Sequence, residues 1–283
     1  PRLPTGLPRS RDLLHRGVSA GAARRSTRPP SAMQAVLFDV EGTTTPIEFV
    51  HQGLFSFARA RLGDHLRDHV DAAEVQNGVR ELRDQREADE RAGLDPPPWR
   101  DDDVAQRLES ATRYCLWLIA ADRKVPALKA LQGRVWEVGY LSGELRGELY
   151  PDVAGALARW HAGGMRIAIF SSGSVLSQRL LFAHSTDGDL SGAIDAYFDT
   201  RTGPKREPQS YRRIAAELRV DAASLLFVSD TREELDAAAA AGVRTALCDR
   251  SATAARAGAH PVVASFDELE PVLARPPEPG MLV

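Results

Sequence analysis

The sequence has few cysteines and no long hydrophobic run. Cys115 and Cys248 are its two cysteines among 283 residues, and they suggest neither a disulfide framework nor a zinc site. No apolar run approaches the roughly 20 residues that a membrane-spanning helix needs. A chain without disulfides is typical of a reducing compartment. These absences predict a cytoplasmic protein with no membrane partner.

Net positive charge is confined to the first 32 residues of the chain. Residues 1–32 hold seven arginines and one aspartate, a net charge of +6, whereas the whole chain carries −3. Residues 33–283 therefore carry −9. Because nucleic-acid binding depends on basic contacts to phosphates, this balance predicts no nucleic-acid partner.

The first 32 residues lack hydrophobic periodicity and are rich in Pro, Ser and Gly. This composition predicts a disordered basic leader over residues 1–32. Two interpretations stay open, a transit peptide or sequence that precedes a true start at Met33. We favour the second, because Met33 is the first methionine and directly precedes the first expected strand.

A short apolar segment, residues 35–38, is followed at once by two acidic residues, Asp39 and Glu41. The segment predicts a buried strand that brings a carboxylate to its C-terminal end, where open parallel sheets place their chemistry. Asp39 has the chemistry of a phosphoryl-accepting nucleophile, and Glu41 that of a general acid and base. An ordinary strand-to-turn junction with solvated acids is equally consistent with these residues alone.

Two regions with different patterns follow. Residues 51–145 show helical periodicity and no strand pattern, including two apolar faces that run from Val104 to Leu118 and from Val125 to Val138. From residue 146 onward, helical and strand segments alternate, with buried strands expected over 166–170, 196–198, 225–229 and 244–248. The sequence predicts an α/β fold, a doubly wound parallel sheet (33–50 and 146–283) with an inserted helical cap domain (51–145).

Three of the expected strands end in polar residues. Ser171 and Ser172 follow the second strand and open a helix, which is a phosphate cradle or simply a helix cap. Asp230 follows the fourth strand, and with Asp39 and a backbone carbonyl it offers the oxygen ligands that Mg²⁺ prefers. Lys205 lies in a loop, where it either neutralises a phosphoryl group and restrains the charge on Asp39 or is solvated. The neighbouring Glu233 and Glu234 are expected to support the site or to form an exposed helix face.

These segments, in this order, resemble the four motifs of the haloacid dehalogenase superfamily. Between about Ala35 and Cys248 the resemblance narrows to the enolase-phosphatase E1 family of methionine salvage. It is carried by FDVEGTTTPIEFV, DRKVPALKALQGRVW, IFSSGSVLSQRLLFAHSTDGDL, FDTRTGPKREPQSY and FVSDTREELDAA. Glu41 stands where most superfamily phosphatases carry aspartate. Thr202 is a mild departure, since the family has an apolar residue there.

The resemblance implies a bifunctional monomeric enzyme with one Mg²⁺. The implied reaction enolises 5-methylthio-2,3-dioxopentyl phosphate and then dephosphorylates it to the acireductone 1,2-dihydroxy-5-(methylthio)pent-1-en-3-one. Asp39 and Glu41 would be catalytic and associated with the metal, and Asp230 would be a metal ligand. Ser171, Ser172 and Lys205 would bind the substrate, and Mg²⁺ together with Lys205 would supply the positive charge that the enolate needs.

Three other functions are weighed against this one. A phosphatase of the same fold for another small phosphate ester is the main alternative, since the cap decides the substrate. A haloacid dehalogenase is disfavoured, because that chemistry needs neither Mg²⁺ nor Glu41. A catalytically inactive binding domain is disfavoured because Asp39, Glu41, Lys205 and Asp230 are all present.

Overall fold

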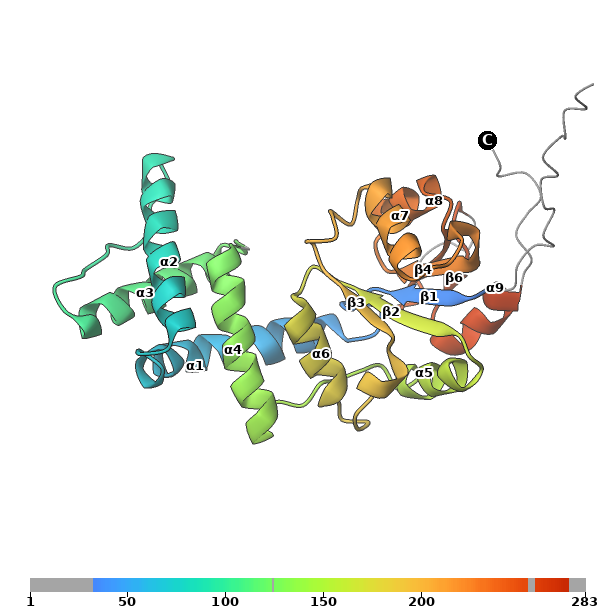
Figure 1. Ribbon diagram of the computed structural model, residues 1–283, viewed down its shortest axis with the longest axis horizontal. Helices are drawn as coiled ribbons and strands as arrows, with labels where there is room; N and C mark the ends of the chain where they lie inside the picture. Colours follow the sequence, from blue (N-terminus) through green and yellow to red (C-terminus); the bar gives the residue numbers. More distant parts are fainter. Residues whose placement is uncertain (1–32, 124, 254–257, 275–283) are drawn as a thin grey trace, which may run out of the picture.

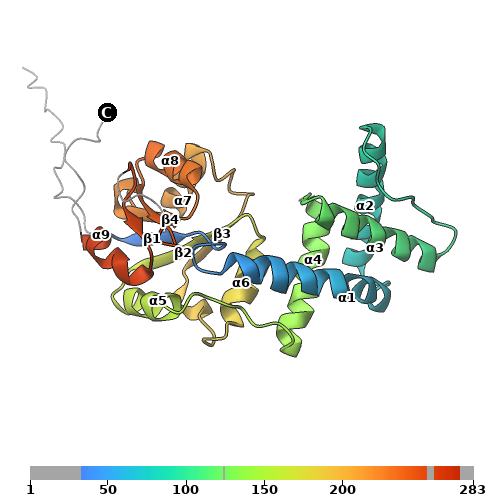
Figure 2. The ribbon, with the colours of Figure 1, turned by 180° about the vertical axis from the view of Figure 1, so that it is seen from behind.

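The computed structural model describes residues 33–123, 125–253 and 258–274. The expected disordered leader, residues 1–32, lies outside the described residues. An α/β unit and a group of helices lie at opposite ends of an elongated molecule, as Figures 1 and 2 show from front and back. The predicted α/β class with a parallel sheet is confirmed.

The sheet has six parallel strands in the order β3-β2-β1-β4-β5-β6. Their bounds are β1 (Ala35–Phe38), β2 (Arg166–Phe170), β3 (Ala196–Phe198), β4 (Leu225–Ser229), β5 (Arg244–Cys248) and β6 (Val262–Val263). The order reverses at β1, which pairs with β2 on one side and β4 on the other. Such a reversal opens a crevice at the C-terminal ends of the strands, where ligands bind in open α/β sheets.

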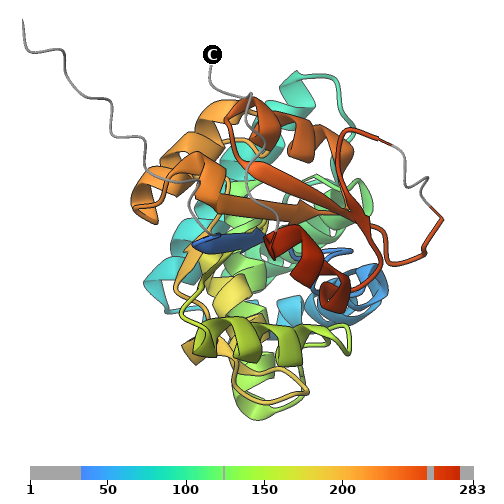
Figure 3. The same cartoon turned by 90° about the vertical axis from the view of Figure 1, so that its right-hand side faces the viewer.

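Helices cover both faces of the sheet (Figure 3). The helices that follow the cap are α5 (Val153–Ala162), α6 (Val175–Ala183), α7 (Pro208–Glu217), α8 (Arg232–Ala240) and α9 (Glu270–Ala274). Because alternate strand residues point to opposite faces, Val36 and Phe38 pack with α5 and α9, whereas Leu37 packs with α7 and α8. All three side chains are fully buried, as expected for a parallel sheet covered on both sides.

The cap helices form one continuous segment of the chain, between β1 and α5. They are a π-helical segment η1 (Phe49–Leu54), α1 (Phe55–Asp68), α2 (Ala73–Arg91), α3 (Val104–Ala120) and α4 (Pro126–Ser142). Asp103 caps α3 by accepting a hydrogen bond from the Gln106 N–H. Pro126 opens α4, and Gly143 ends it in the left-handed conformation (φ 78°). The proposed domain boundaries, 50/51 and 145/146, lie within a few residues of these helix ends.

The two apolar faces predicted for the cap are mostly buried, with one exposed residue in each and with Val125 only partly buried. Val104 and Val138 were expected on these faces, but they are 50% and 47% exposed. Val104 is the first residue of α3, and Val138 lies in the last turns of α4. Within the described part of the chain, no helix is both long and apolar enough to cross a membrane.

Candidate active site

The site lies where three neighbouring strands end. β2, β1 and β4 are adjacent in the sheet, and the residues that follow them are Ser171, Asp39 and Asp230. Parallel strands run in register here, since Phe38 pairs with both Ile169 and Val228. The side chains predicted to act together are therefore brought to one edge of the sheet.

Asp39 is a buried carboxylate, 6% exposed, that is oriented by several donors. Its Oδ1 accepts a hydrogen bond from the Val40 N–H at 2.7 Å and lies 2.7 Å from Lys205 Nζ. The Ser229 hydroxyl lies 3.4 Å from Oδ2. The Asp39 backbone N–H donates to the Val228 carbonyl at 3.0 Å, which continues the hydrogen bonding between β1 and β4. Asp39 thus has a fixed orientation, as a nucleophile needs for in-line attack.

Lys205 reaches Asp39 from the loop before α7 and is almost completely buried. Its ammonium bridges Asp39 and Glu234, with Nζ 2.6 Å from Glu234 Oε2. Burial alone would lower the Lys205 pKa, but the two carboxylates outweigh it and the pKa lies above its ordinary value. The Tyr211 hydroxyl donates to the Lys205 carbonyl at 2.6 Å and fixes the loop. Lys205 is therefore a cation held beside the nucleophile, not a solvated loop residue.

Glu234 is a site residue that the sequence left open. Its side chain is 13% exposed, whereas Glu233 is on the exposed face of α8. Burial, followed by the charge of Asp39, raises the Glu234 pKa. It also accepts a hydrogen bond from the Ser229 hydroxyl at 3.2 Å. Its position in the first turn of the helix after Asp230 was the available signal, but only the tertiary contact with Lys205 distinguishes it from Glu233.

Asp230 adds a second carboxylate close to Asp39. Burial and then the charge of Asp39 raise its pKa, so the two acids repel one another across the site. The turn after Asp39 packs tightly on Asp230, because a Cβ placed on Gly42 would lie 2.3 Å from Asp230 Oδ2. Gly42 also has a φ of 72°, which favours glycine. A divalent cation between the two carboxylates would relieve their repulsion, so the donor set fits Mg²⁺.

Side chains alone do not complete such a metal site. Among the described residues, no group of three or more His, Cys, Asp and Glu side chains is placed to hold a metal ion. Asp39 and Asp230 would supply two carboxylate ligands, and backbone carbonyls or water the others, which is common for Mg²⁺. A contribution from Glu41 would have to come from its main chain, because its carboxylate is directed elsewhere.

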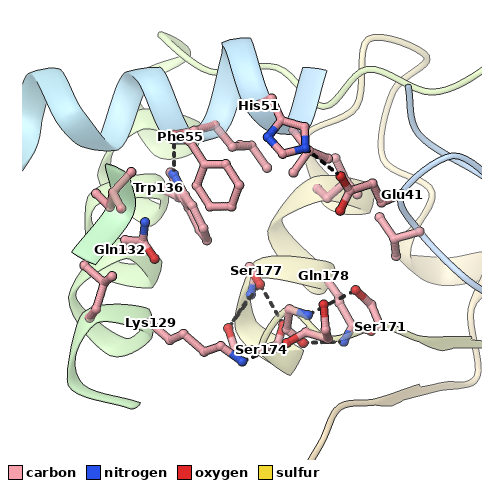
Figure 4. A pocket seen from close by; sticks show the side chains of 18 of the residues that line it. Glu41, His51, Phe55, Lys129, Gln132, Trp136, Ser171, Ser174, Ser177 and Gln178 are labelled. Atoms are coloured by element: carbon pink, nitrogen blue, oxygen red, sulfur yellow. Dashed lines mark hydrogen bonds and ion pairs between the residues drawn. The ribbon is translucent and has the colours of Figure 1, made fainter. Parts of the chain in front are cut away.

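Glu41 faces His51 of η1. His51 Nε2 lies 3.1 Å from Glu41 Oε1, and both side chains are partly exposed to a cavity (Figure 4). His51 was not identified from the sequence. It lies in a π-helical turn, a feature that is frequent at functional sites. The cap therefore contributes a polar partner to Glu41, one of the two predicted catalytic acids.

Arg250 holds the turn between Glu41 and Pro46 in place. Its guanidinium donates to the Thr43 carbonyl at 2.6 Å and 3.1 Å and pairs with Asp152 at 2.7 Å. It also lies over the Tyr150 ring, 4.2 Å from its centroid. This largely buried arginine follows β5 in the chain, and no local sequence pattern marks it.

The two serines after β2 form the start of the α6 loop. The Ser171 hydroxyl accepts a hydrogen bond from the Gly173 N–H at 3.1 Å, and Ser174 caps the helix by accepting from the Ser177 N–H at 3.2 Å. Ser172 is exposed, and its carbonyl accepts a hydrogen bond from Lys129 Nζ of α4 at 3.2 Å. Ser174 thus serves as the cap, which leaves Ser171 and Ser172 at the mouth of the loop, facing the cavity.

A cavity of about 460 Å³ lies between the cap and the ends of the strands. Its core side is polar, with Glu41, Ser171 and Ser172 among the residues. Its cap side combines an apolar part, which includes Phe55 and Trp136, with polar and charged side chains such as Lys129 (Figure 4). The Trp136 ring is fixed by a hydrogen bond from Nε1 to the Leu54 carbonyl at 2.8 Å. A pocket of this size suits a small substrate with one polar and one apolar end.

Known proteins resemble this chain over most of its length. Residues 33–242 match the family model for haloacid dehalogenase-like hydrolases. Enolase-phosphatase E1 of Synechococcus elongatus is 48% identical over 241 residues, which is 85% of this chain and 99% of that protein. Enolase-phosphatase E1 of Frankia alni is 48% identical over 246 residues, 86% of this chain and 98% of that protein. The chain belongs to the enolase-phosphatase E1 family of haloacid dehalogenase-like hydrolases.

A solved structure supports the same family fold. The crystal structure of the UTR4 protein from Saccharomyces cerevisiae has a TM-score of 0.67 and 32% identity, covering 84% of this chain and 99% of that chain. The buried acids and the cavity above them lie at the C-terminal ends of the strands. This is where a hydrolase with an open α/β sheet is expected to bind its substrate. The expected resemblance to this family is confirmed.

Proposed function

We propose that this chain is an enolase-phosphatase that converts 5-methylthio-2,3-dioxopentyl phosphate to an acireductone and phosphate in methionine salvage. One observation carries the proposal: a buried Asp39–Lys205 pair lies beside a cap-covered cavity in a chain 48% identical to named enolase-phosphatases. The cavity has polar groups for the phosphate and diketone and an apolar wall for the methylthio end. The main alternative is a phosphatase of this fold for another small phosphate ester.

The proposed dephosphorylation step uses Asp39 and Glu41. The Asp39 carboxylate attacks phosphorus, and the bond between phosphorus and the substrate oxygen breaks. Glu41 supplies a proton to that leaving oxygen and then accepts one from the water that hydrolyses the aspartyl phosphate. Ser171, Ser172 and Lys205 would bind the phosphate group, since hydroxyl, N–H and ammonium donors match its oxygens.

Hydrolases of this family generally use Mg²⁺, and here Asp39, Asp230 and a main-chain oxygen near Glu41 would hold it. When bound, the cation supplies positive charge that offsets the two carboxylates and the phosphate. Lys205 and Glu234 hold the Asp39 side chain in position in either case.

The test is an assay of the purified full chain with the diketone phosphate and Mg²⁺. We expect enol absorbance to appear and phosphate to be released, both of them lost after exhaustive chelation. Asp230→Asn should raise the Mg²⁺ concentration needed for half-maximal activity, whereas Asp236→Asn, an exposed acid on α8, should not. Full activity after chelation would exclude the metal, and activity on simple esters without activity on the diketone phosphate would favour the alternative.

Several further features belong to the proposal. We propose a monomer that acts in the cytoplasm on a small phosphorylated molecule, with neither nucleic acid nor membrane as partner. The location is supported by Cys115 and Cys248, which are both buried free thiols. The core over 33–50 and 146–283 and the cap over 51–145 are proposed as the two domains.

A further inference from the structure

The enolisation step needs a positive group at the carbonyl oxygen on which charge develops. Lys205 was expected to contribute this charge, but its position makes it unsuitable. Its side chain is only 9% exposed and its ammonium is committed to Asp39 and Glu234. It is also absent from the residues that line the cavity. The substrate carbonyl in the cavity therefore needs another donor.

Three cations of the described residues line the cavity from the cap, namely Arg59, Arg123 and Lys129. Arg123 is committed to the buried Asp89, to which its Nη2 donates at 2.9 Å. Arg59 and Lys129 form no ion pair with any residue in the described ranges. Lys129 alone of these two reaches the core, where its Nζ donates to the Ser172 carbonyl at 3.2 Å.

The contact with Ser172 places the Lys129 ammonium at the polar end of the cavity. Ser172 belongs to the loop that would bind the phosphate, so the ammonium lies near the phosphorylated carbon and its neighbouring carbonyl. An ammonium carries three N–H donors, so a hydrogen bond to Ser172 leaves others for a ligand. In Figure 4, Lys129 and Glu41 lie on opposite sides of the cavity, with room for a ligand between them.

We propose that Lys129 is a catalytic residue of the enolisation step, in which it stabilises the enolate oxygen. The inference rests on the proposed function. The C–H bond of the phosphorylated carbon breaks and its proton passes to the Glu41 carboxylate. The electron pair forms a double bond to the adjacent carbon, and the carbonyl π pair moves onto oxygen, where Lys129 donates a hydrogen bond and then a proton that solvent replaces. Glu41 is then protonated, as the following dephosphorylation step requires.

The experiment separates the two half-reactions in the full-length protein with Mg²⁺. Exchange of hydrogen for solvent deuterium at the phosphorylated carbon reports enolisation, and p-nitrophenyl phosphate, which has no enolisable C–H, reports phosphoryl transfer. Lys129→Met should slow exchange about 100-fold, the loss typical of removing one charge-stabilising donor, and leave nitrophenyl hydrolysis within about threefold. Lys129→Arg, which keeps the charge, should recover part of the exchange.

Arg59→Met is the matched control, because it removes another cation that lines the same cavity and has no ion pair among the described residues. It should change exchange by less than about fivefold, since it tests only the general effect of positive charge. Thermal unfolding midpoints of all three variants should match that of the native chain. Unchanged exchange in Lys129→Met would overturn the inference, as would an equal loss of exchange and nitrophenyl hydrolysis, which would make Lys129 a cap–core contact. If the native chain neither exchanges nor releases phosphate from the diketone phosphate, the proposed function itself fails.

Discussion

Asp39 lies between a positively charged side chain, Lys205, and a second carboxylate, Asp230. Its carboxylate is adjacent to the Lys205 ammonium on one side and close enough to Asp230 to raise the pKa of that acid. Lys205 and a divalent cation would both offset this concentration of negative charge. The residue can therefore approach a phosphate dianion, which isolated carboxylates would repel.

Replacing Asp39 should separate the two half-reactions. Asp39→Asn should abolish phosphate release, because an amide is a poor nucleophile and no phosphoaspartate can form. Enolisation needs only a base near the carbon and positive charge near the oxygen, so deuterium exchange should persist. Proton NMR in heavy water, alongside a phosphate assay, measures both in one sample.

The matching variant for this prediction is Glu41→Gln. It should impair both half-reactions, because Glu41 is assigned the proton in each. If Asp39→Asn protein that still binds substrate shows no exchange, the two steps share Asp39 and the division of roles is wrong.

Most of the predicted site residues have positions that follow from the ends of strands, whereas the role of Lys205, a loop residue, rested on the family resemblance. Asp39, Ser171 and Asp230 each follow a buried apolar run, so the sheet itself brings them together. Glu234 was left open because no local pattern distinguishes it from Glu233, and His51 was not identified. Glu234 contacts Lys205, and His51 contacts Glu41. Each contact joins two different segments of the chain and therefore appears only in the folded protein.

The bounds of the strands could be predicted from the sequence. The extent of the buried faces of the helices could be predicted less well. The bounds expected for 166–170, 196–198, 225–229 and 244–248 match β2 to β5, because each run ends in a polar or turn-forming residue. Helical periodicity also located the cap helices. It could not show where a buried face stops, so Val104 and Val138 were assigned to faces that neighbouring helices leave uncovered.

A buried network joins two cap helices to the loop above the cavity. Asp89 of α2 is 3% exposed and accepts hydrogen bonds from the Tyr114 hydroxyl at 2.6 Å and Gln85 Nε2 at 2.8 Å, as well as from Arg123. The residue before Arg123, Asp122, has a φ of 48°, an uncommon conformation for a residue other than glycine. The network therefore fixes a loop that the backbone alone would not favour.

Neutralising Asp89 should destabilise the protein in a way that depends on pH. Burial opposes ionisation of Asp89, but the hydrogen bonds from Arg123, Tyr114 and Gln85 outweigh it and lower its pKa. A lowered pKa in the folded state gives stability that is fully present above the unfolded value of about 4 and is lost as pH falls through the folded pKa. Asp89→Asn should cost about 3 kcal/mol at pH 7, because it leaves Arg123 without its charged partner.

Urea unfolding between pH 3 and pH 7 measures this effect. The difference between Asp89→Asn and the native chain should be constant above about pH 5 and narrow below about pH 4. Asp84→Asn is the control, because Asp84 is an exposed acid on the same helix, and it should change stability by less than about 0.5 kcal/mol. A difference that does not vary with pH would mean that the charge of Asp89 is not what stabilises the network.

The cap and one face of the sheet share a continuous apolar cluster. The same set of buried side chains includes Phe38 and Val228 of the sheet and Leu62 and Trp136 of the cap. α4 packs against α6, so the cap wall and the serine loop keep a fixed relation across the cavity. The proposals therefore place phosphoryl transfer at the strand ends and apolar recognition of the substrate in the cap, which also supplies Lys129 to the enolisation step.

This division predicts how the enzyme should respond to shortened substrates. A diketone phosphate that lacks the terminal methylthio group should lose about 10- to 100-fold in kcat/KM with the native chain, since one or two apolar groups contribute about 1–3 kcal/mol in such a pocket. Phe55→Ala removes part of the apolar wall, so it should lower kcat/KM for the full substrate and leave the shortened one nearly unchanged. The native preference should then fall to a few-fold.

Leu141→Ala provides the control for this comparison. Leu141 lies near the end of α4, is 69% exposed and does not line the cavity, so its removal should leave both substrates and their ratio unchanged. Steady-state kinetics of the native chain, Phe55→Ala and Leu141→Ala with both substrates gives the coupling free energy between the Phe55 side chain and the methylthio group. An equal loss on both substrates in Phe55→Ala would show that Phe55 supports the cap without contacting the methylthio end. In that case the polar wall alone, including Lys129 and Glu41, would select the substrate.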